Sequence, residues 1–190
     1  MKKCISMILC IILCISMCMP CYAKTNTRGD ELLNQATMRE PYISPNPYVT
    51  PCVAAIFAEM TPDMTPAEKV QFCYDWLIYN CHYITDEDMA NSQTIPDFYD
   101  YYNNNAFCEN SEVDASTYQM IVEHYGDCIV YSKAFVGLTR AMGFDSHVVY
   151  GTVKKRDGSD TGHMWAEITI NGTECYFDPQ IEDNNLLRIK

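Results

Sequence analysis

Apolar residues recur at helical spacing over residues 128–142. Most of them lie three or four positions apart, as one buried face of a helix requires: Val130, Ala134, Leu138, Ala141 and Met142. Arg140 falls in the expected last turn, and Gly143 fits the position just past the helix end. The pattern predicts a helix that opens at Cys128, with Asp127 near its N-cap.

A second region alternates apolar and polar residues and predicts an antiparallel hairpin. Residues 147–153 are typical of a strand, and residues 154–162 are polar and suit a long loop. Residues 163–170 alternate again, with one apolar face: Met164, Ala166, Ile168 and Ile170. Asn171-Gly172 is the strongest short hairpin signal, so residues 174–178 are expected to return as the partner strand.

The register between the strands predicted at 163–170 and 174–178 brings two polar residues together. If Asn171-Gly172 is a two-residue turn, Trp165 lies directly opposite Asp178. His163 is then a diagonal neighbour of Asp178 on the same face, opposite the apolar one. Each of the two residues also has an ordinary explanation: His163 as a polar strand residue, and Asp178 as a turn former before Pro179. Those explanations do not account for the shared face.

A thiol, an imidazole and a carboxylate therefore occur in chain order, at Cys128, His163 and Asp178. The free N–H groups and dipole of a helix N-terminus stabilise a thiolate and can hold a developing oxyanion. Asp178 can accept from one ring nitrogen and leave the other for the thiol. The three residues predict a nucleophile, a base and an orienting group. Cys128 taken alone is more simply a buried structural cysteine.

These motifs resemble the transglutaminase-like superfamily, whose core is similar to that of papain-type cysteine proteases. The likeness covers about residues 65–183, in five motifs: Gly126-Asp127-Cys128, Arg140-Ala141-Met142-Gly143, Val149-Tyr150-Gly151, His163-Met164-Trp165 and Phe177-Asp178-Pro179. It implies an α+β fold in which the Cys-bearing helix packs on an antiparallel sheet. It also implies Cys128 as nucleophile, His163 as base and Asp178 as orienting group. Animal members place an aromatic residue after the Cys, where this chain has Ile129, so the closer likeness is to short secreted bacterial members.

The resemblance implies a secreted cysteine-dependent acyl-transfer enzyme that acts on amide bonds of peptides or proteins through a thioester. Water as the acceptor would make it a protease or amidase, and a primary amine would make it a transglutaminase. No cofactor is implied. The alternative is a non-catalytic cell-surface protein-binding module of the same fold. A zinc site built from Cys128, His163 and Asp178 is the least favoured interpretation, because the family chemistry uses these residues without metal.

Two aromatic residues are candidates for substrate binding or for the oxyanion site. Trp165 shares the face of His163, so it is either a wall of the acyl pocket or an ordinary aromatic strand residue. Tyr83 stands where members of the family often carry an aromatic residue after the first long helix. It is a candidate donor to the oxyanion beside the Cys128 N–H, although packing is the more common role for such a residue.

Composition divides the chain into three parts. Residues 1–23 have the pattern of a signal peptide, with two lysines, an apolar run and a small-ended cleavage site. Residues 24–51 contain several prolines and predict an extended N-terminal arm. Residues 52–190 predict one transglutaminase-like domain. Its acidic and aromatic residues 86–116 predict a long insertion, a candidate lid over the cleft.

Charge and the short apolar run limit the partners. The net charge is −12, and removal of residues 1–23 would take away two lysines and no acid. Nucleic acid and anionic membrane surfaces are therefore not expected as partners. The apolar run is short for a membrane span, so we do not expect an integral membrane protein after signal cleavage. The expected location is outside the cytoplasm, and association with the cell envelope stays open.

The remaining signals concern a helix and the thiols. Thr65-Pro66-Ala67-Glu68 is a capping box with Pro at the first helical position, and it predicts a helix to about Asn80. Cys73 and Cys175 lie in apolar runs and are expected to be core thiols. No disulfide is assigned, because a free Cys128 leaves an odd number of other cysteines after residue 23.

Overall fold

The computed structural model describes residues 28–91, 104, 110–155, 157–180 and 188–189. Its helices are α2 (Arg28–Asn34), α3 (Val49–Phe57), α4 (Pro66–Asn80), α5 (Asp86–Asn91), α7 (Ser111–Val122) and α8 (Cys128–Ala141). Its strands are β1 (His82–Tyr83), β2 (Tyr125–Gly126), β3 (Ser146–Lys154), β4 (Asp160–Ile170), β5 (Thr173–Phe177) and β6 (Arg188–Ile189). None of the helices in these ranges has the length and apolar character needed to cross a membrane.

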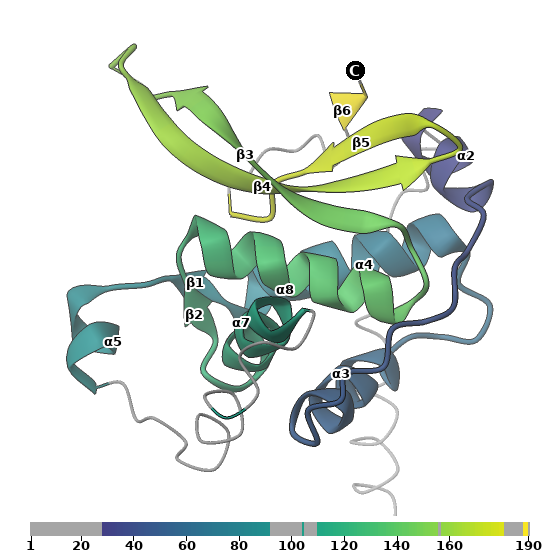
Figure 1. The fold of residues 1–190 in the computed structure, drawn as a ribbon, viewed down its shortest axis with the longest axis horizontal. Helices are drawn as coiled ribbons and strands as arrows, with labels where there is room; N and C mark the ends of the chain where they lie inside the picture. The colour runs from purple at the N-terminus through teal and green to yellow at the C-terminus, as the bar shows by residue number, and fades with distance from the viewer. Residues whose placement is uncertain (1–27, 92–103, 105–109, 156, 181–187, 190) are drawn as a thin grey trace, which may run out of the picture.

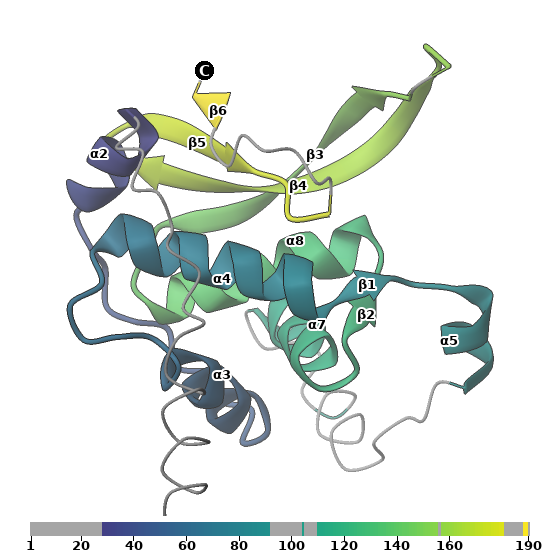
Figure 2. The same ribbon diagram turned by 180° about the vertical axis from the view of Figure 1, so that it is seen from behind.

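Helix α8 is the centre of the fold. A four-stranded antiparallel sheet of order β3-β4-β5-β6 lies over it (Figure 1). Helices α4 and α7 pack against the sides of α8 that the sheet leaves free (Figure 2). The predicted α+β fold, with a Cys-bearing helix on an antiparallel sheet, is confirmed.

The core fills the space between α8 and the sheet. Its fully buried side chains come from both layers: Ala134, Phe135 and Leu138 from α8, and Ala166, Ile168 and Cys175 from the strands. The ring of Phe135 lies 5.1 Å from that of Phe177 and 5.8 Å from that of Tyr74, measured between centroids. Truncation of Phe135 to Ala would remove both contacts and cost about 3–5 kcal/mol of folding free energy.

The ends of α8 lie where the sequence predicts them. The Asp127 carboxylate accepts from the N–H groups of Ile129 and Val130, at 3.0 Å each, and so caps the first turn. Gly143 has φ +94°, and a Cβ there would lie 2.5 Å from the carbonyl oxygen of Arg39. Only glycine satisfies both conditions at low cost. The cap therefore fixes Cys128 as the first residue of the helix.

The turn between β4 and β5 has the predicted two residues. Ile170 pairs with Thr173, and Asn171 and Gly172 have φ of 50° and 82°. Positive φ at both central residues matches the twist of a two-residue hairpin. The side chain of Asn171 also donates to the backbone carbonyl of Gln35, at 3.0 Å, which fastens the turn to the segment after α2.

The prediction of a long loop at 154–162 is wrong. Strand β3 runs to Lys154 and β4 begins at Asp160, where these two residues pair. Their side chains form an ion pair of 2.9 Å, and Lys155 N–H donates to the Ser159 carbonyl at 2.8 Å. Polar composition suggested a loop because both strands leave the core here, and their side chains are solvated on both faces.

Helices occupy both ends of the predicted insertion at 86–116. Its first part forms α5, and its last part opens α7, which packs on α8. Asp114 and Ser116 are buried there, although both types usually lie at the surface. Residues 92–103 and 105–109 lie outside the described residues, and so does most of the candidate lid.

The predicted arm at 24–51 is in part helical and packs against the domain. It contains α2 and the start of α3, whose Leu33 and Val49 are buried. Between these helices, Arg39 N–H donates to the Gly143 carbonyl at 2.7 Å, and Tyr42 N–H donates to the Arg140 carbonyl at 3.0 Å. The segment is therefore tied to the end of α8. Residues 24–27 and the predicted signal peptide lie outside the described residues.

Helix α4 has the predicted capping box. Thr65 Oγ1 accepts from Glu68 N–H at 3.3 Å, and the Glu68 carboxylate accepts from Thr65 N–H at 2.8 Å. Cys73 and Cys175 are fully buried, as expected of core thiols. All five cysteines in the described ranges are free thiols: Cys52, Cys73, Cys81, Cys128 and Cys175. Cys108 lies outside them.

Candidate active site

The predicted nucleophile, Cys128, is the first residue of α8 and is half-buried. It follows β2, and β2 pairs in parallel with β1 through Tyr83 opposite Gly126. A Cβ on Gly126 would lie 2.6 Å from the Cβ of Val130, so the chain can enter the helix this tightly only with glycine. The thiol is thus held at a helix N-terminus on the edge of a small sheet.

The predicted base and orienting group are in direct contact. Nε2 of His163 lies 2.7 Å from Oδ2 of Asp178. An ionised carboxylate only accepts, so Nε2–H donates and Nδ1 is left for another partner. The imidazole is only 6% exposed. This burial restricts its rotation and excludes water from most of the ring.

Asp178 is itself held by a residue that sequence reasoning missed. Tyr74 of α4 donates its hydroxyl to the Asp178 carbonyl at 2.6 Å. The Asp178 carboxylate also accepts from Gln180 N–H at 3.3 Å through its other oxygen. Tyr74 carries an apolar helical signal, because its ring packs in the core, and only the fold shows where its hydroxyl points.

Ser132 joins the start of α8 to the strand that carries His163. Its hydroxyl lies 2.7 Å from the Cys128 carbonyl and 3.0 Å from the Met164 carbonyl. It is fully buried and lies one helical turn after Cys128. The residue next to His163 is therefore tied to the turn that carries the thiol. Among the described residues, no hydrogen bond joins the Cys128 thiol to His163.

Tyr83 lies beside the start of α8, and its role as an oxyanion donor stays a prediction. Its side chain is 52% exposed. Its pKa is raised above the usual value, by burial of the hydroxyl first and then by the charges of Cys128 and Asp127. A tyrosine close enough to feel both charges can present its hydroxyl to the same space.

Trp165 contacts the base and is half-buried. Its ring centroid lies 6.3 Å from that of His163. A Cβ on Gly151 would lie 2.3 Å from the indole, so the ring covers the glycine opposite His163. The indole N–H is buried, and no described residue accepts a hydrogen bond from it. Trp165 supports the position of the imidazole, and its role as a pocket wall stays a prediction.

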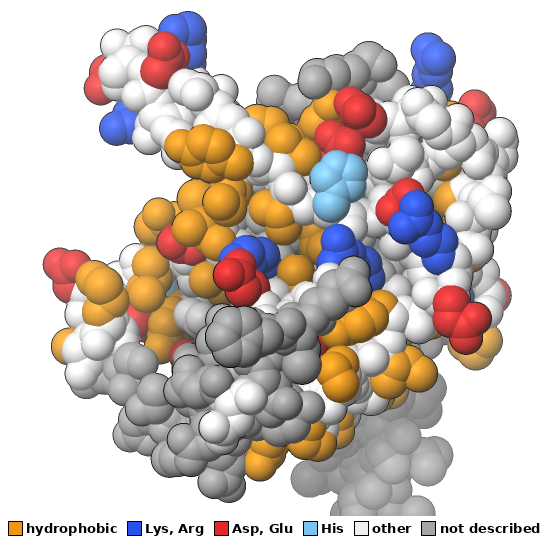
Figure 3. Space-filling model, viewed as in Figure 1, with side chains coloured by type: hydrophobic (Ala, Val, Ile, Leu, Met, Phe, Trp, Pro, Cys, Tyr) orange, Lys and Arg blue, Asp and Glu red, His pale blue; other side chains and the backbone are white. Residues whose placement is uncertain are grey.

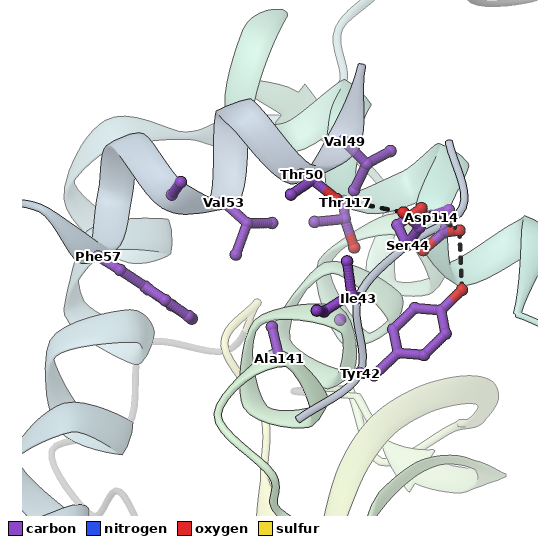
Figure 4. Close-up of a pocket in the computed structure, with 12 residues that line it drawn as sticks. Tyr42, Ile43, Ser44, Val49, Thr50, Val53, Phe57, Asp114, Thr117 and Ala141 are labelled. Carbon is purple, nitrogen blue, oxygen red and sulfur yellow. Dashed lines mark hydrogen bonds between the residues drawn. The ribbon is translucent and has the colours of Figure 1, made fainter. Parts of the chain in front are cut away.

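A cavity of about 160 Å³ lies at the other end of α8 (Figure 4). Its lining includes Tyr42, Ser44, Asp114 and Ala141. Ala141 is thirteen residues after Cys128, which along a helix is about 20 Å. The cavity is therefore separate from the catalytic candidates, and we place the site at the start of α8 on chemical grounds.

The carboxylate of Asp114 is the main polar group of that cavity. It accepts from the Tyr42 hydroxyl at 3.0 Å and from the Ser44 hydroxyl at 2.6 Å. Burial raises its pKa, and the hydrogen bonds from Ser44 and Tyr42 and the charge of Arg140 oppose that rise. Burial and the neighbouring carboxylate raise the pKa of Tyr42 to about 12.

Metal ligands do not gather at either place. In the described part of the chain, no three His, Cys, Asp or Glu side chains are arranged to hold an ion. The described chemistry at the start of α8 is that of a thiol and a His–carboxylate pair.

Comparison with known proteins places this arrangement in a family. The Transglutaminase-like superfamily profile matches residues 54–179, a range that includes Cys128, His163 and Asp178. The chain belongs to the transglutaminase-like superfamily. No curated protein matches the sequence.

Two solved structures are similar to this transglutaminase-like chain. One is described as a putative cysteine protease from Cytophaga hutchinsonii, with a TM-score of 0.50 and 17% identity over 78% of this chain and 43% of the other. Another is described as a TGase, with a TM-score of 0.42 and 13% identity over 87% of this chain and 36% of the other. The chain spans less than half the length of both. At 17% identity, the likeness to the first of these structures concerns the fold alone.

Proposed function

We propose that this protein is a cysteine-dependent acyl-transfer enzyme that acts on amide bonds of peptides or proteins. The observation that carries the proposal is the 2.7 Å contact between His163 Nε2 and Asp178 Oδ2. It leaves Nδ1 of a buried imidazole free for a thiol, next to a strand residue that Ser132 ties to Cys128. In this arrangement the carboxylate stabilises the imidazolium that forms when the base takes a proton.

The proposed reaction has two steps. Nδ1 of His163 takes the proton of the Cys128 thiol, and the sulfur attacks the amide carbonyl carbon. The C–N bond then breaks, His163 gives the proton to the leaving amine, and a thioester remains on Cys128. A water molecule or a second amine attacks the thioester and returns its proton through His163. The C–S bond breaks, and the thiol is restored.

The oxyanion of each step needs donors near the sulfur. The Asp127 side chain already occupies the N–H groups of Ile129 and Val130. We therefore assign the oxyanion to the Cys128 N–H and the Tyr83 hydroxyl. A tyrosine hydroxyl is protonated at neutral pH, and the pKa of Tyr83 is raised above its usual value, so this hydroxyl can donate.

The acceptor decides between two enzyme classes. Water gives a protease or amidase, and a primary amine gives a transglutaminase. The acidic chain favours peptide or protein substrates over nucleic acid. The signal-like pattern of residues 1–23 supports action outside the cytoplasm, in solution or at the cell envelope.

A second candidate is a non-catalytic protein-binding module of the same fold. The observation that favours it is that no hydrogen bond joins Cys128 to His163 among the described residues. In a binding module the His163–Asp178 pair would only stabilise the hairpin. Thiol reactivity separates the two candidates, because only the enzyme needs an activated sulfur.

The test is an activity-based thiol probe followed by a peptide library, with and without a primary amine donor. We expect Cys128 to be labelled first and peptides to be cleaved or joined to the amine. Cys128→Ala should lose both labelling and turnover, and Cys52→Ala, at another half-buried thiol, should lose neither. Turnover by folded Cys128→Ala would exclude the mechanism. An unlabelled Cys128 without turnover in the wild type would favour the binding module.

A further inference from the structure

The cavity at the far end of α8 has the size of a site for a small molecule. Its walls come from α3, α7, α8 and the segment before α3 (Figure 4). Its volume of about 160 Å³ is close to that of an apolar protein cavity of about 150 Å³ that binds benzene. The cavity therefore has room for a molecule of about six non-hydrogen atoms.

The cavity can be reached from solvent. Three of the residues that line it are exposed at the surface: Ile43, Thr50 and Ala54. On the face shown in Figure 3, hydrophobic side chains are exposed over α3 and the segment before it. A small molecule can therefore enter without separation of the helices around the cavity.

Most of the cavity wall is apolar. In Figure 4 the side chains of Ile43, Val53, Phe57 and Ala141 surround one space. An apolar wall offers water few hydrogen bonds, so a hydrocarbon group that replaces water there is favoured. This part of the wall suits the apolar portion of a ligand.

The polar end of the cavity is formed by the Asp114 carboxylate and the two hydroxyls that donate to it. Tyr42 and Ser44 donate to the same oxygen, Oδ2, at 3.0 and 2.6 Å. Among the described residues, no hydrogen bond reaches the other carboxylate oxygen, Oδ1. An ionised carboxylate has lone pairs on both oxygens, so Asp114 can still accept from a ligand.

The two threonines in the wall also donate their hydroxyl hydrogens to the protein. The Thr50 hydroxyl donates to the Ser44 carbonyl at 3.2 Å, and the Thr117 hydroxyl donates to the Val113 carbonyl at 2.7 Å. A hydroxyl has one hydrogen and two lone pairs, so the hydroxyls of the wall have only lone pairs left for a ligand. The side chains of the polar end therefore match a ligand that donates hydrogen bonds, and they disfavour an anion.

The charge of Asp114 is incompletely compensated by the protein. The residue is only 4% exposed, and burial raises its pKa more than its hydrogen bonds and the charge of Arg140 lower it. The guanidinium of Arg140 donates to the Ser146 carbonyl at 2.7 Å and to the side chain of Asn110. A cation in the cavity would therefore stabilise the ionised form of Asp114.

We propose that this cavity binds a primary ammonium ion that carries an apolar group of about four to six carbon atoms. An ammonium group has three donors and no acceptor, which matches a polar end whose side chains accept. Its hydrogen bond to the Asp114 carboxylate would be charge-assisted, and such bonds are about twice as strong as neutral ones. The apolar group would lie against the apolar wall. Because the site is at the opposite end of α8 from Cys128, the inference does not rest on the proposed acyl-transfer function.

The test is an NMR titration with butylammonium chloride and with butan-1-ol, which has the same hydrocarbon chain and no charge. We expect butylammonium to shift the amide signals of residues 42–50 and 114–117, with a dissociation constant on the order of 1 mM for a ligand of this size. Butan-1-ol should bind at least about tenfold more weakly, because it offers one neutral donor. Sodium chloride at equal concentrations is the control for ionic strength.

Asp114→Asn tests the polar end of the cavity. The amide keeps the shape of the carboxylate and loses its charge, so butylammonium should bind at least about tenfold more weakly, while the affinity for butan-1-ol should change little. The matched control is Asp86→Asn, which removes an exposed carboxylate from the first turn of α5. It should leave both affinities as in the wild type.

Ala141→Leu tests the apolar part of the cavity and leaves Asp114 in place. The larger side chain should fill the space that the hydrocarbon chain needs, so the shifts caused by both ligands should be lost. The matched control is Ala55→Leu, which adds the same atoms at an exposed position of α3 outside the cavity wall. It should bind both ligands as the wild type does.

Several results would overturn the inference. They are butylammonium shifts no larger than those of sodium chloride, equal affinities of the wild type for the two ligands, and butylammonium binding that is unchanged in folded Asp114→Asn or Ala141→Leu. If either variant does not fold, the comparison of the two ligands with the wild type still decides. None of these results bears on catalysis at Cys128.

Discussion

His163 and Asp178 meet across the end of a hairpin, with Nε2 and Oδ2 2.7 Å apart, although fifteen positions separate them in the chain. The contact depends on the two-residue turn at Asn171-Gly172, which sets the register of β4 and β5. A shift of one residue would place the two side chains on opposite faces. A substitution at either residue of this pair therefore tests the proposed chemistry directly.

We expect Asp178→Asn to lower kcat without unfolding the protein. The amide keeps the shape of the carboxylate and its oxygen can still accept a hydrogen bond, but it lacks the negative charge that stabilises the imidazolium. The loss should be on the order of 10²–10⁴-fold, and smaller than that of Cys128→Ala. Steady-state kinetics with a thermal melt checks it, and an unchanged kcat would refute the orienting role.

We expect Cys128 to be alkylated faster than the other thiols of the described chain at neutral pH. Burial raises the pKa of Cys52 and Cys73, and it raises the pKa of Cys81 to about 12. Burial, with the charge of Glu167, raises the pKa of Cys175 to about 11.

Native iodoacetamide labelling followed by mass spectrometry gives the order of reaction. Denatured protein is the control, because all the thiols should then react at similar rates. If Cys52 or Cys81 reacts first in the native protein while Cys128 stays unlabelled, the helix N-terminus does not activate the thiol.

Ser132→Ala should break the link between the helical turn that carries Cys128 and the strand that carries His163. The Met164 carbonyl loses its donor, so we expect a loss of about 1 kcal/mol of folding free energy. We also expect a fall in kcat of about tenfold, because small displacements of reacting groups are costly. Thr139→Ala is the control, since Thr139 is another buried helical hydroxyl, at the far end of α8. It should destabilise the fold with little effect on kcat.

Asp114 should make the stability depend on pH in a particular direction. Burial raises its pKa in the folded state, so the native protein binds more protons than the unfolded chain between the two pKa values. Its contribution is therefore most favourable below the unfolded pKa, about 3.9. That contribution is lost as the pH rises through the raised pKa of the folded state.

Asp114→Asn removes this titration. The free energy of unfolding of the variant, relative to that of the wild type, should therefore increase from pH 4 to pH 7. Urea denaturation at several pH values measures the difference, which cancels the effect of other acids. A difference that stays constant with pH would mean that Asp114 has no raised pKa in the folded protein.

Local signals in the sequence predict α8 and the β4–β5 turn well. The Asp127 cap, Gly143 and Asn171-Gly172 act within a few residues of the positions they determine, so their effects can be read from the chain. The register then brings His163 beside Asp178, because strand side chains alternate with a period of two.

Other parts of the site depend on contacts between distant segments. Ser132 and Tyr74 occupy apolar helical positions, and their polar atoms acquire a role only when β4 and β5 pack nearby. The sequence pattern predicts no helix where α7 lies, and it places the start of α7 in an insertion because Asp114 looks like a surface residue. Its donors, Tyr42 and Ser44, lie about seventy positions earlier in the chain.

Residues 38–48 are attached to the end of α8 but lie outside the recognisable family region. The boundary of the folded unit therefore differs from the boundary of the family region. The recognisable family region begins at residue 54, but Tyr42 and Ser44 satisfy a buried carboxylate inside it. The backbone N–H of Tyr42 donates to the carbonyl of Arg140 in the last turn of α8, and that of Arg39 donates to the carbonyl of Gly143 just after the helix. A polypeptide trimmed to the family region would lose these donors, including the Tyr42 and Ser44 hydroxyls that the buried Asp114 carboxylate accepts from. The unit that folds cooperatively is therefore larger than the unit that is recognisable by descent.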